Sequence, residues 1–302
     1  MGLGRKATFV SALLAVAAAG PAPAADRPRI LGISHAAFRV GDLARARAFY
    51  ADLLGYAVEP TRGGLRVAVN ERQYVSVRGG LAAGQDRLDH LALETDGAAA
   101  LRRELARRGA AVSALTHDES GNPAFTLRDP EGWTIELVEH GARTWPRAAP
   151  ASPSALSGRI LHAGVLVGDL DAANRFYGGL LGLAETWRGS RNGTELSWTN
   201  MKLPDGDDYV ELMLYAKLPP GDARGTPHHI CLEVPDVEAA KARLAPRAAA
   251  AGYTRPLEAR VGTNRKRQLN LFDADGTRVE LMEPRTVDGR PVPSSTAPPP
   301  AR

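Results

Sequence analysis

One long motif occurs twice in this chain of 302 residues, as SHAAFRVGDLARARAFYADLLGY at 34–56 and as LHAGVLVGDLDAANRFYGGLLGL at 161–183. Two shorter pairs of matching segments follow in the same order: LDHLALETDG with PHHICLEVPD, and FTLRDPEGWTIELVE with LNLFDADGTRVELME. The offset between the copies grows along the chain, from 127 residues to 139 and then 144. This order predicts two homologous units, of which the second carries longer loops.

Each unit is itself built from two similar halves. In unit one, a short apolar run precedes a helix predicted over about 42–54, and a second run at 88–95 precedes a helix predicted over about 97–108. Apolar residues recur at three- and four-residue spacing in the first helix, and short runs broken by Gly, Asp, Asn and Pro follow each helix. Each half reads β-α-β-β-β, so the predicted fold class is α+β, with paired βαβββ modules in tandem. Asp42 and Asp169 precede the first helix of each unit and are predicted to cap it.

The composition predicts where the units begin and end. A chain of this length is enough for two domains, predicted at 28–140 and 159–283. Pro, Ala and Ser are frequent between them, which predicts a linker at 141–158. The segment 284–302 is rich in proline and has no apolar period, so we expect a disordered tail.

The first residues have the pattern of a secretory signal. Arg5 and Lys6 precede an apolar run at 7–19 and an Ala-Pro-Ala sequence at 22–24. This predicts a signal peptide over 1–25 and a secreted or periplasmic protein. The rest of the chain has no stretch long and apolar enough for a membrane span after processing. Cys231 is the only cysteine, so no internal disulfide forms and the fold must rest on its core.

The charge pattern argues against a nucleic-acid partner. The formal net charge is +4, and the arginines are scattered along the chain without a nucleic-acid-binding motif. The composition does not define an oligomeric state.

These repeats resemble the vicinal oxygen chelate superfamily, which includes glyoxalase I, extradiol dioxygenases and bleomycin-resistance proteins. The resemblance rests on the paired modules, on a His in the first and the fifth strand of each unit, and on a Glu in the segment DPEGWTIE or DADGTRVE. It covers about 30–140 and 160–283. It implies a cup-shaped mixed sheet in each unit, with flanking helices and with metal ligands on the first, fourth, fifth and eighth strands.

Carried over by position, the resemblance implies one metal site in each unit. The ligands in unit two are His162, Glu211, His229 and Glu280. Those in unit one are His35, His90 and Glu136, with Ser76 at the fourth position. Imidazole and carboxylate together can hold Zn, Ni, Co, Mn or Fe(II), so the expected cofactor is a divalent metal ion of undefined identity. Because serine is a weak ligand, unit one is expected to hold the weaker site.

The resemblance implies that the partner is a small-molecule substrate with oxygen atoms able to chelate the metal. Three functions are compatible with such a site. The first is a lyase or isomerase of the glyoxalase type, in which the metal holds two substrate oxygens and Glu211 or Glu280 is the catalytic base. The second is an extradiol-type dioxygenase with Fe(II) or Mn(II), for which two His and one Glu suffice. The extradiol pattern also has a Tyr where this chain has Thr126 and Asn270. The third is a non-catalytic small-molecule-binding protein, like the bleomycin-resistance relatives.

The four ligands can be assembled in two ways. Short connections join the modules of one unit, so closing them together costs less chain entropy, and we expect each site to form within one unit. In the crossed alternative, His162 and Glu211 would meet His90 and Glu136.

Overall fold

The computed structural model describes residues 27–118, 120–141 and 152–301. The predicted signal peptide and most of the predicted linker lie outside the described residues. Within the described ranges, no helix combines the length and the hydrophobicity that a membrane crossing requires.

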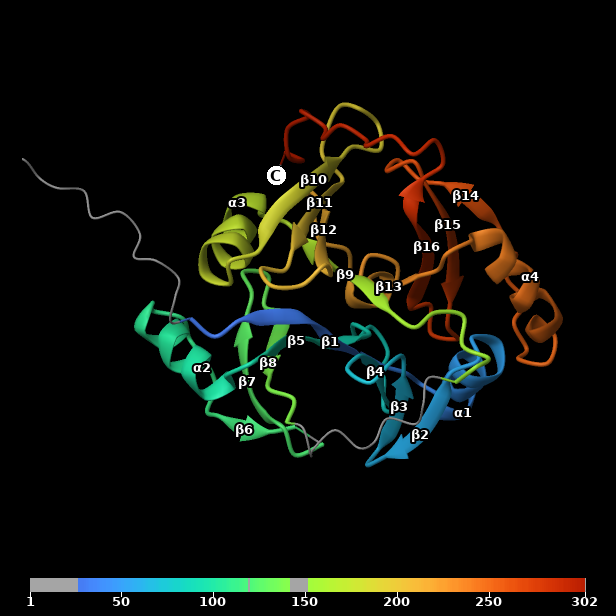
Figure 1. Ribbon diagram of the computed structural model, residues 1–302, viewed down its shortest axis with the longest axis horizontal. Helices are drawn as coiled ribbons and strands as arrows, with labels where there is room; N and C mark the ends of the chain where they lie inside the picture. The colour runs from blue at the N-terminus through green and yellow to red at the C-terminus, as the bar shows by residue number, and fades with distance from the viewer. Residues whose placement is uncertain (1–26, 119, 142–151, 302) are drawn as a thin grey trace, which may run out of the picture.

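Unit one forms a mixed sheet in which eight strands of the described chain take part, in the order β2-β3-β4-β1-β5-β8-β7-β6. β1 runs parallel to β4 and antiparallel to β5, and β5 runs parallel to β8. Figure 1 shows this sheet curving from β7 and β8 on one side to β2 and β3 on the other. The strands are β1 (Ile30–Arg39), β2 (Ala57–Thr61), β3 (Gly64–Ala68), β4 (Tyr74–Arg78), β5 (Leu88–Thr95), β6 (Thr116–His117), β7 (Pro123–Arg128) and β8 (Thr134–Val138).

Unit two repeats this topology, with the order β10-β11-β12-β9-β13-β16-β15-β14 in the described residues. Both units therefore contain the βαβββ module twice, and the predicted fold of two cup-shaped sheets is confirmed (Figure 1). The strands are β9 (Ile160–Val167), β10 (Ala184–Gly189), β11 (Trp198–Lys202), β12 (Tyr209–Leu214), β13 (His229–Glu233), β14 (Ala259–Val261), β15 (Lys266–Phe272) and β16 (Arg278–Thr286).

The helices cover the outer faces of the sheets. The predicted caps are confirmed, because Asp42 accepts hydrogen bonds from the first turn of its helix and Asp169 accepts one from Ala172. Both helices change after one turn from α to the wider π winding, which differs from the continuous α-helix expected over 42–54. The helices are α1 (Leu43–Arg47), η1 (Ala48–Leu53), α2 (Ala98–Arg107), α3 (Leu170–Ala173), η2 (Asn174–Leu180), η3 (Gly221–Ala223) and α4 (Val237–Ala248).

The repeated Val-Gly-Asp-Leu motif joins the two units. Glu131, in the turn before β8, accepts hydrogen bonds from the backbone N–H groups of Gly168 and Asp169 at 2.8 and 3.0 Å. The equivalent turn of unit two repeats the contact, with Asp275 accepting from Gly41 at 3.1 Å. Each unit thus binds the start of the other unit's first helix, where unpaired N–H groups favour an anion.

The tail differs from the prediction. β16 continues to Thr286, so the strand runs past the predicted domain boundary at 283. Further on, Ser295 donates a backbone hydrogen bond to Arg188 at 2.9 Å, and Leu196 donates one to Pro298 at 2.7 Å. Arg188 belongs to the edge strand β10, whose outer backbone groups are available, and Leu196 lies in the loop after it. Backbone hydrogen bonds thus connect the proline-rich segment to unit two, and its disorder stays a prediction from composition.

One hydrogen bond between the units can be tested against its repeat. The Tyr177 hydroxyl donates to the buried Asp129 carboxylate at 2.9 Å, whereas the hydroxyl of Tyr50 has no hydrogen-bond partner among the described residues. We expect Tyr177→Phe to lower the free energy of unfolding by about 2 kcal/mol, because a buried carboxylate loses a donor. Tyr50→Phe is the matched control and should change it by less than about 0.5 kcal/mol. Equal losses in urea unfolding would contradict the assignment.

Asp129 should also make stability depend on pH. Burial raises the pKa of its carboxyl to about 6 from 3.8, although the Tyr177 hydroxyl opposes the shift. Between these values the folded chain keeps a proton that the unfolded chain releases, so stability falls as pH rises, by up to about 3 kcal/mol. Asp129→Asn should remove this part of the slope in urea unfolding between about pH 4 and about pH 7. An unchanged slope in the variant would refute this prediction.

Candidate metal centres

The predicted ligand positions fall on the four central strands of each sheet. Residues paired across these strands form rows, here called rungs, and the ligands lie on two rungs that are two residues apart and share one face. In unit two, the register places Tyr209, His162, Cys231 and Glu280 on the first rung. The second rung consists of Glu211, Gly164, His229 and Arg278. Adjacent rungs bring side chains from four strands to one spot on the inner face, although these residues are far apart in the chain.

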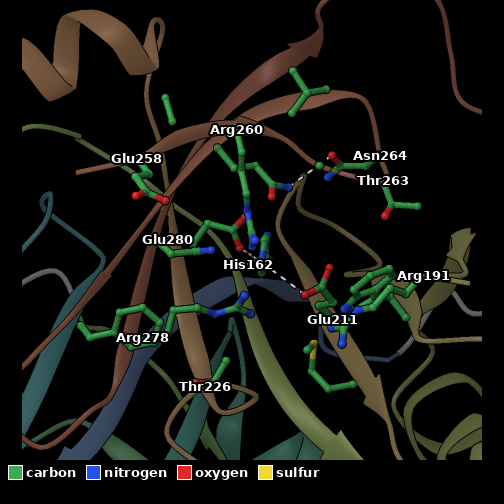
Figure 2. Close-up of a pocket in the computed structure, with 18 of the residues that line it drawn as sticks. His162, Arg191, Glu211, Thr226, Glu258, Arg260, Thr263, Asn264, Arg278 and Glu280 are labelled. Atoms are coloured by element: carbon green, nitrogen blue, oxygen red, sulfur yellow. Dashed lines mark hydrogen bonds and ion pairs between the residues drawn. The ribbon is translucent and has the colours of Figure 1, made fainter. Parts of the chain in front are cut away.

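The four predicted ligands of unit two come together. The Nε2 atoms of His162 and His229 lie 3.1 Å apart, and an oxygen of Glu280 lies 3.6 Å from each. An oxygen of Glu211 lies 3.8 Å from His162 and 3.5 Å from His229. Figure 2 shows His162, Glu211 and Glu280 converging on one space. This is the within-unit arrangement that the sequence predicts.

A hydrogen bond settles the tautomer of His229. Its Nδ1 lies 2.8 Å from the carbonyl oxygen of Pro227, which can only accept, so Nδ1 carries the proton. The lone pair is then on Nε2 and faces the cluster, as metal-binding histidines require. The ring lies over Gly164, where a Cβ would collide with it. Glycine at this position of β9 is therefore needed to seat the ligand.

Unit one repeats the arrangement with three donors. The Nε2 atoms of His35 and His90 lie 2.9 Å apart, and Glu136 lies 3.7 Å from His35. Asp89 accepts from Nδ1 of His90 at 2.9 Å, which again leaves Nε2 free to bind a metal. Hydrogen bonding to His90 lowers the pKa of Asp89 to about 2. Ser76 lies buried on β4 as predicted and brings no carboxylate to the cluster.

The surroundings of Glu211 and Glu280 shift the pKa values of these two carboxyl groups in opposite directions. Burial raises the pKa of Glu211, and the charge of Glu280 adds to this effect, while His162 opposes it. Burial would also raise the pKa of Glu280, but hydrogen bonding with His162 and the positive charge of Arg278 outweigh it and hold that pKa well below its usual range. A pair with pKa values pushed apart has one anionic ligand and one group that can exchange a proton. Glu280 suits the first role and Glu211 the second.

The cluster lies in the wall of a cavity of about 1070 Å³ inside the cup of unit two. Five Trp, Tyr and Phe residues line it: Trp187, Trp198, Tyr215, Tyr253 and Phe272. Four arginines line it as well: Arg191, Arg255, Arg260 and Arg278. A cavity of this size can enclose a small aromatic molecule together with the cluster.

Both clusters fit a divalent cation by their chemistry. Burial lowers the pKa of His229 to about 3, and Arg278 acts in the same direction, so its imidazole is neutral at ordinary pH. In unit one, the buried Oε1 of Glu136 accepts no hydrogen bond from the described residues. A buried carboxylate oxygen without a donor beside two imidazole lone pairs is satisfied by a cation, and imidazole with carboxylate suits Zn, Co, Ni, Mn or Fe(II).

The sequence interpretation missed Arg278. It stands two residues before Glu280 on β16, and therefore on the same face of the strand, directly opposite His229 in the register. The two-residue spacing from Glu280 could have identified Arg278 from the sequence, because residues i and i+2 of a strand share a face.

Two family models match the chain. The model of the Glyoxalase/Bleomycin resistance protein/Dioxygenase superfamily matches 159–281, and a glyoxalase-like domain model matches 35–138. The chain belongs to this superfamily. Both units are therefore members of the family that their repeats resemble, as predicted. A comparison with curated proteins finds no match.

Solved structures of dioxygenases share the fold of this superfamily member. An extradiol ring-cleaving dioxygenase from B. fuscum superposes with a TM-score of 0.65 at 20% identity, over 92% of this chain and 78% of that one. The 2,2',3-trihydroxybiphenyl 1,2-dioxygenase from Sphingomonas wittichii gives 0.64 at 18% identity, over 84% and 90%. The 2,3-dioxygenase LapB from Pseudomonas gives 0.64 at 17% identity, over 88% and 97%. At these identities the likeness shows a common fold.

Removing one ligand should empty the site of unit two. We expect Glu280→Ala to weaken metal binding there by more than about tenfold, because a buried anionic donor is lost. Glu258→Ala is the matched control, since Glu258 is exposed on the wall of the same cavity and lies outside the cluster. Metal per chain would be measured by mass spectrometry after dialysis against a weak chelator. Equal metal content in both variants would contradict the assignment.

Proposed function

We propose that this chain is a divalent-metal-dependent enzyme of the dioxygenase type that acts on a small oxygen-chelating substrate in the cup of unit two. The observation that carries the proposal is the buried set of His162, His229 and Glu280 on three adjacent strands. Two histidines and one carboxylate form the ligand set of non-haem Fe(II) oxygenases. The fold shared with ring-cleaving dioxygenases supports the same choice.

The proposed role of each site residue follows from its position in the cup. A bound cation would supply Lewis-acid chemistry, and iron or manganese would add electron transfer with dioxygen. His162, His229 and Glu280 would hold it, with His229 kept in the binding tautomer by Pro227. Glu211 would accept or return a proton at its carboxylate, since burial raises its pKa toward the range where such exchange is effective. The aromatic walls would orient the substrate and exclude water.

A lyase or isomerase reaction is the second candidate, because Glu211 favours it. This carboxylate lies within 3.8 Å of both imidazole nitrogens and makes a four-donor set of two His and two Glu. In such a reaction Glu211 would remove a proton from a carbon next to a carbonyl group of the substrate. Asn270 stands where the extradiol pattern has a tyrosine, and this difference also favours the second candidate.

Unit one is proposed to hold a second, weaker metal site. Its three donors, His35, His90 and Glu136, lie within 4.8 Å of one another. Ser76 stands where Glu211 stands in unit two, so the cluster of unit one has a single carboxylate, Glu136. Catalysis is therefore assigned to unit two.

Metal content and oxygen consumption together test the proposal. The protein would be purified without nickel affinity, loaded with Fe(II), Mn(II), Zn(II), Ni(II) or Co(II), and supplied with catechol and its carboxylated derivatives. We expect Fe(II) or Mn(II) protein to consume dioxygen and form a ring-cleaved product, and Glu280→Ala to lower the rate by more than about 100-fold. Glu258→Ala is the control.

Other results would redirect the assignment. Proton exchange or isomerisation of hydroxy-carbonyl compounds without oxygen uptake, lost in Glu211→Gln, would favour the second candidate. Failure to retain any of the five ions would refute a metal-dependent enzyme and favour a binding protein.

A further inference from the structure

The cup of unit two contains a buried cationic side chain that forms no close ion pair with the described residues. Arg278 is 8% exposed, and in the described residues no carboxylate oxygen lies within 4.0 Å of its guanidinium nitrogens. Its Nε atom has no hydrogen-bond partner among them either. A buried guanidinium is costly unless an anion pairs with it, so the missing partner is expected to be a ligand.

Arg278 is not needed to build this fold. The equivalent residue of unit one is Thr134, which stands two residues before Glu136 just as Arg278 stands two before Glu280. Unit one still brings its three donors together around that threonine. On the same rung, unit two has Glu211 where unit one has Ser76. Glu211 and Arg278, two residues of opposite charge on one rung, are therefore additions to one cup.

The guanidinium of Arg278 lies against the ring of the metal ligand His229. Its Nη2 is 2.7 Å from Nε2 and 2.8 Å from Nδ1 of that ring, and therefore lies over the ring face. A cation bound at Nε2 of His229 would repel the guanidinium, which leaves its donors available to an anion. An anionic oxygen bound beside the cation is within reach of these donors, because Arg278 and His229 face each other across one rung.

The rest of the cavity is suited to an aromatic acid. Four arginines and three glutamates line it, and a divalent cation would make the excess of positive charge larger. Figure 2 shows Arg278 below the ligand cluster, with Arg191 and Arg260 at other parts of the wall. Trp187 and Trp198 supply flat apolar surfaces for a ring.

We propose that Arg278 binds the carboxylate of an aromatic hydroxy acid whose acidic group is adjacent to the hydroxyl that chelates the metal. The proposal deepens the proposed function of unit two and rests on it, since it names the class of substrate for that site. Arg278 pairs with the carboxylate through its two terminal nitrogens, and the metal and the acid strengthen each other's binding. Arg260 and Arg191 only raise the local concentration of anions.

Salicylate, benzoate and catechol separate the two parts of this recognition. Each would be titrated into metal-free and Co(II)-loaded protein, with tryptophan fluorescence as the readout, because Trp187 and Trp198 line the cavity. We expect wild-type protein to bind salicylate more tightly than benzoate or catechol, and more tightly with Co(II) than without it. Arg278→Thr should weaken salicylate binding by roughly tenfold or more in both forms, with little effect on catechol.

The variants provide the controls. Threonine is the residue of unit one, so Arg278→Thr fits a strand of this fold, and Arg278→Lys should restore part of the salicylate affinity. Arg260→Ala removes an exposed arginine of the same cavity and should change that affinity by less than about twofold. Co(II) affinity, measured by dialysis, should stay equal or rise in Arg278→Thr, because a like charge is removed.

Two results distinguish the possible failures. Salicylate binding that is the same in Arg278→Thr and wild type, in both metal-free and loaded protein, would overturn the role of Arg278 and leave the metal site intact. Absence of Co(II) binding in wild type would refute the proposed function. In that case, a tenfold loss of salicylate affinity in metal-free Arg278→Thr would still support an anion site at Arg278.

Discussion

The register of the four central strands is the constraint on which this structure depends. In unit two it places His162 beside Cys231 and Glu280, and His229 beside Gly164, so that donors from distant segments face one hollow. A shift of one residue in any of these strands would turn its ligand to the opposite face of the sheet. The apolar neighbours of each ligand, such as Val279 and Leu281, oppose such a shift because they are buried in the core on the other face.

Burial then determines what the converging side chains can do. His229 is neutral because the cup excludes water and Arg278 lies against it. Glu280 is held as an anion by His162 and the positive charge of Arg278, while Glu211, on the next rung, has a raised pKa. Two carboxyl groups of one type thus acquire different chemistry from their positions. Unit one has the same imidazole pair without this second carboxylate, and the difference separates the proposed roles of the two cups.

The two units also depend on each other through the repeated turn and helix start. Glu131 of unit one binds the N–H groups before the first helix of unit two, and Asp275 binds Gly41 in return. Next to the metal ligand His229, His228 is fully buried and lies 3.0 Å from Asp86 of unit one. A loop of unit one therefore supports the start of β13, the strand that carries His229.

The amino-acid sequence by itself determined the repeat, the order of strands and helices, and the residues with metal-binding chemistry. It could do so because strand alternation and helix spacing are local patterns, and because His35, His90, His162 and His229 recur at matching positions. Only the tertiary structure decided that each cluster closes within its own unit, that the proline-rich tail pairs with β10, and that Arg278 faces His229. These outcomes depend on pairing between strands far apart in the chain and on burial, which no local pattern encodes.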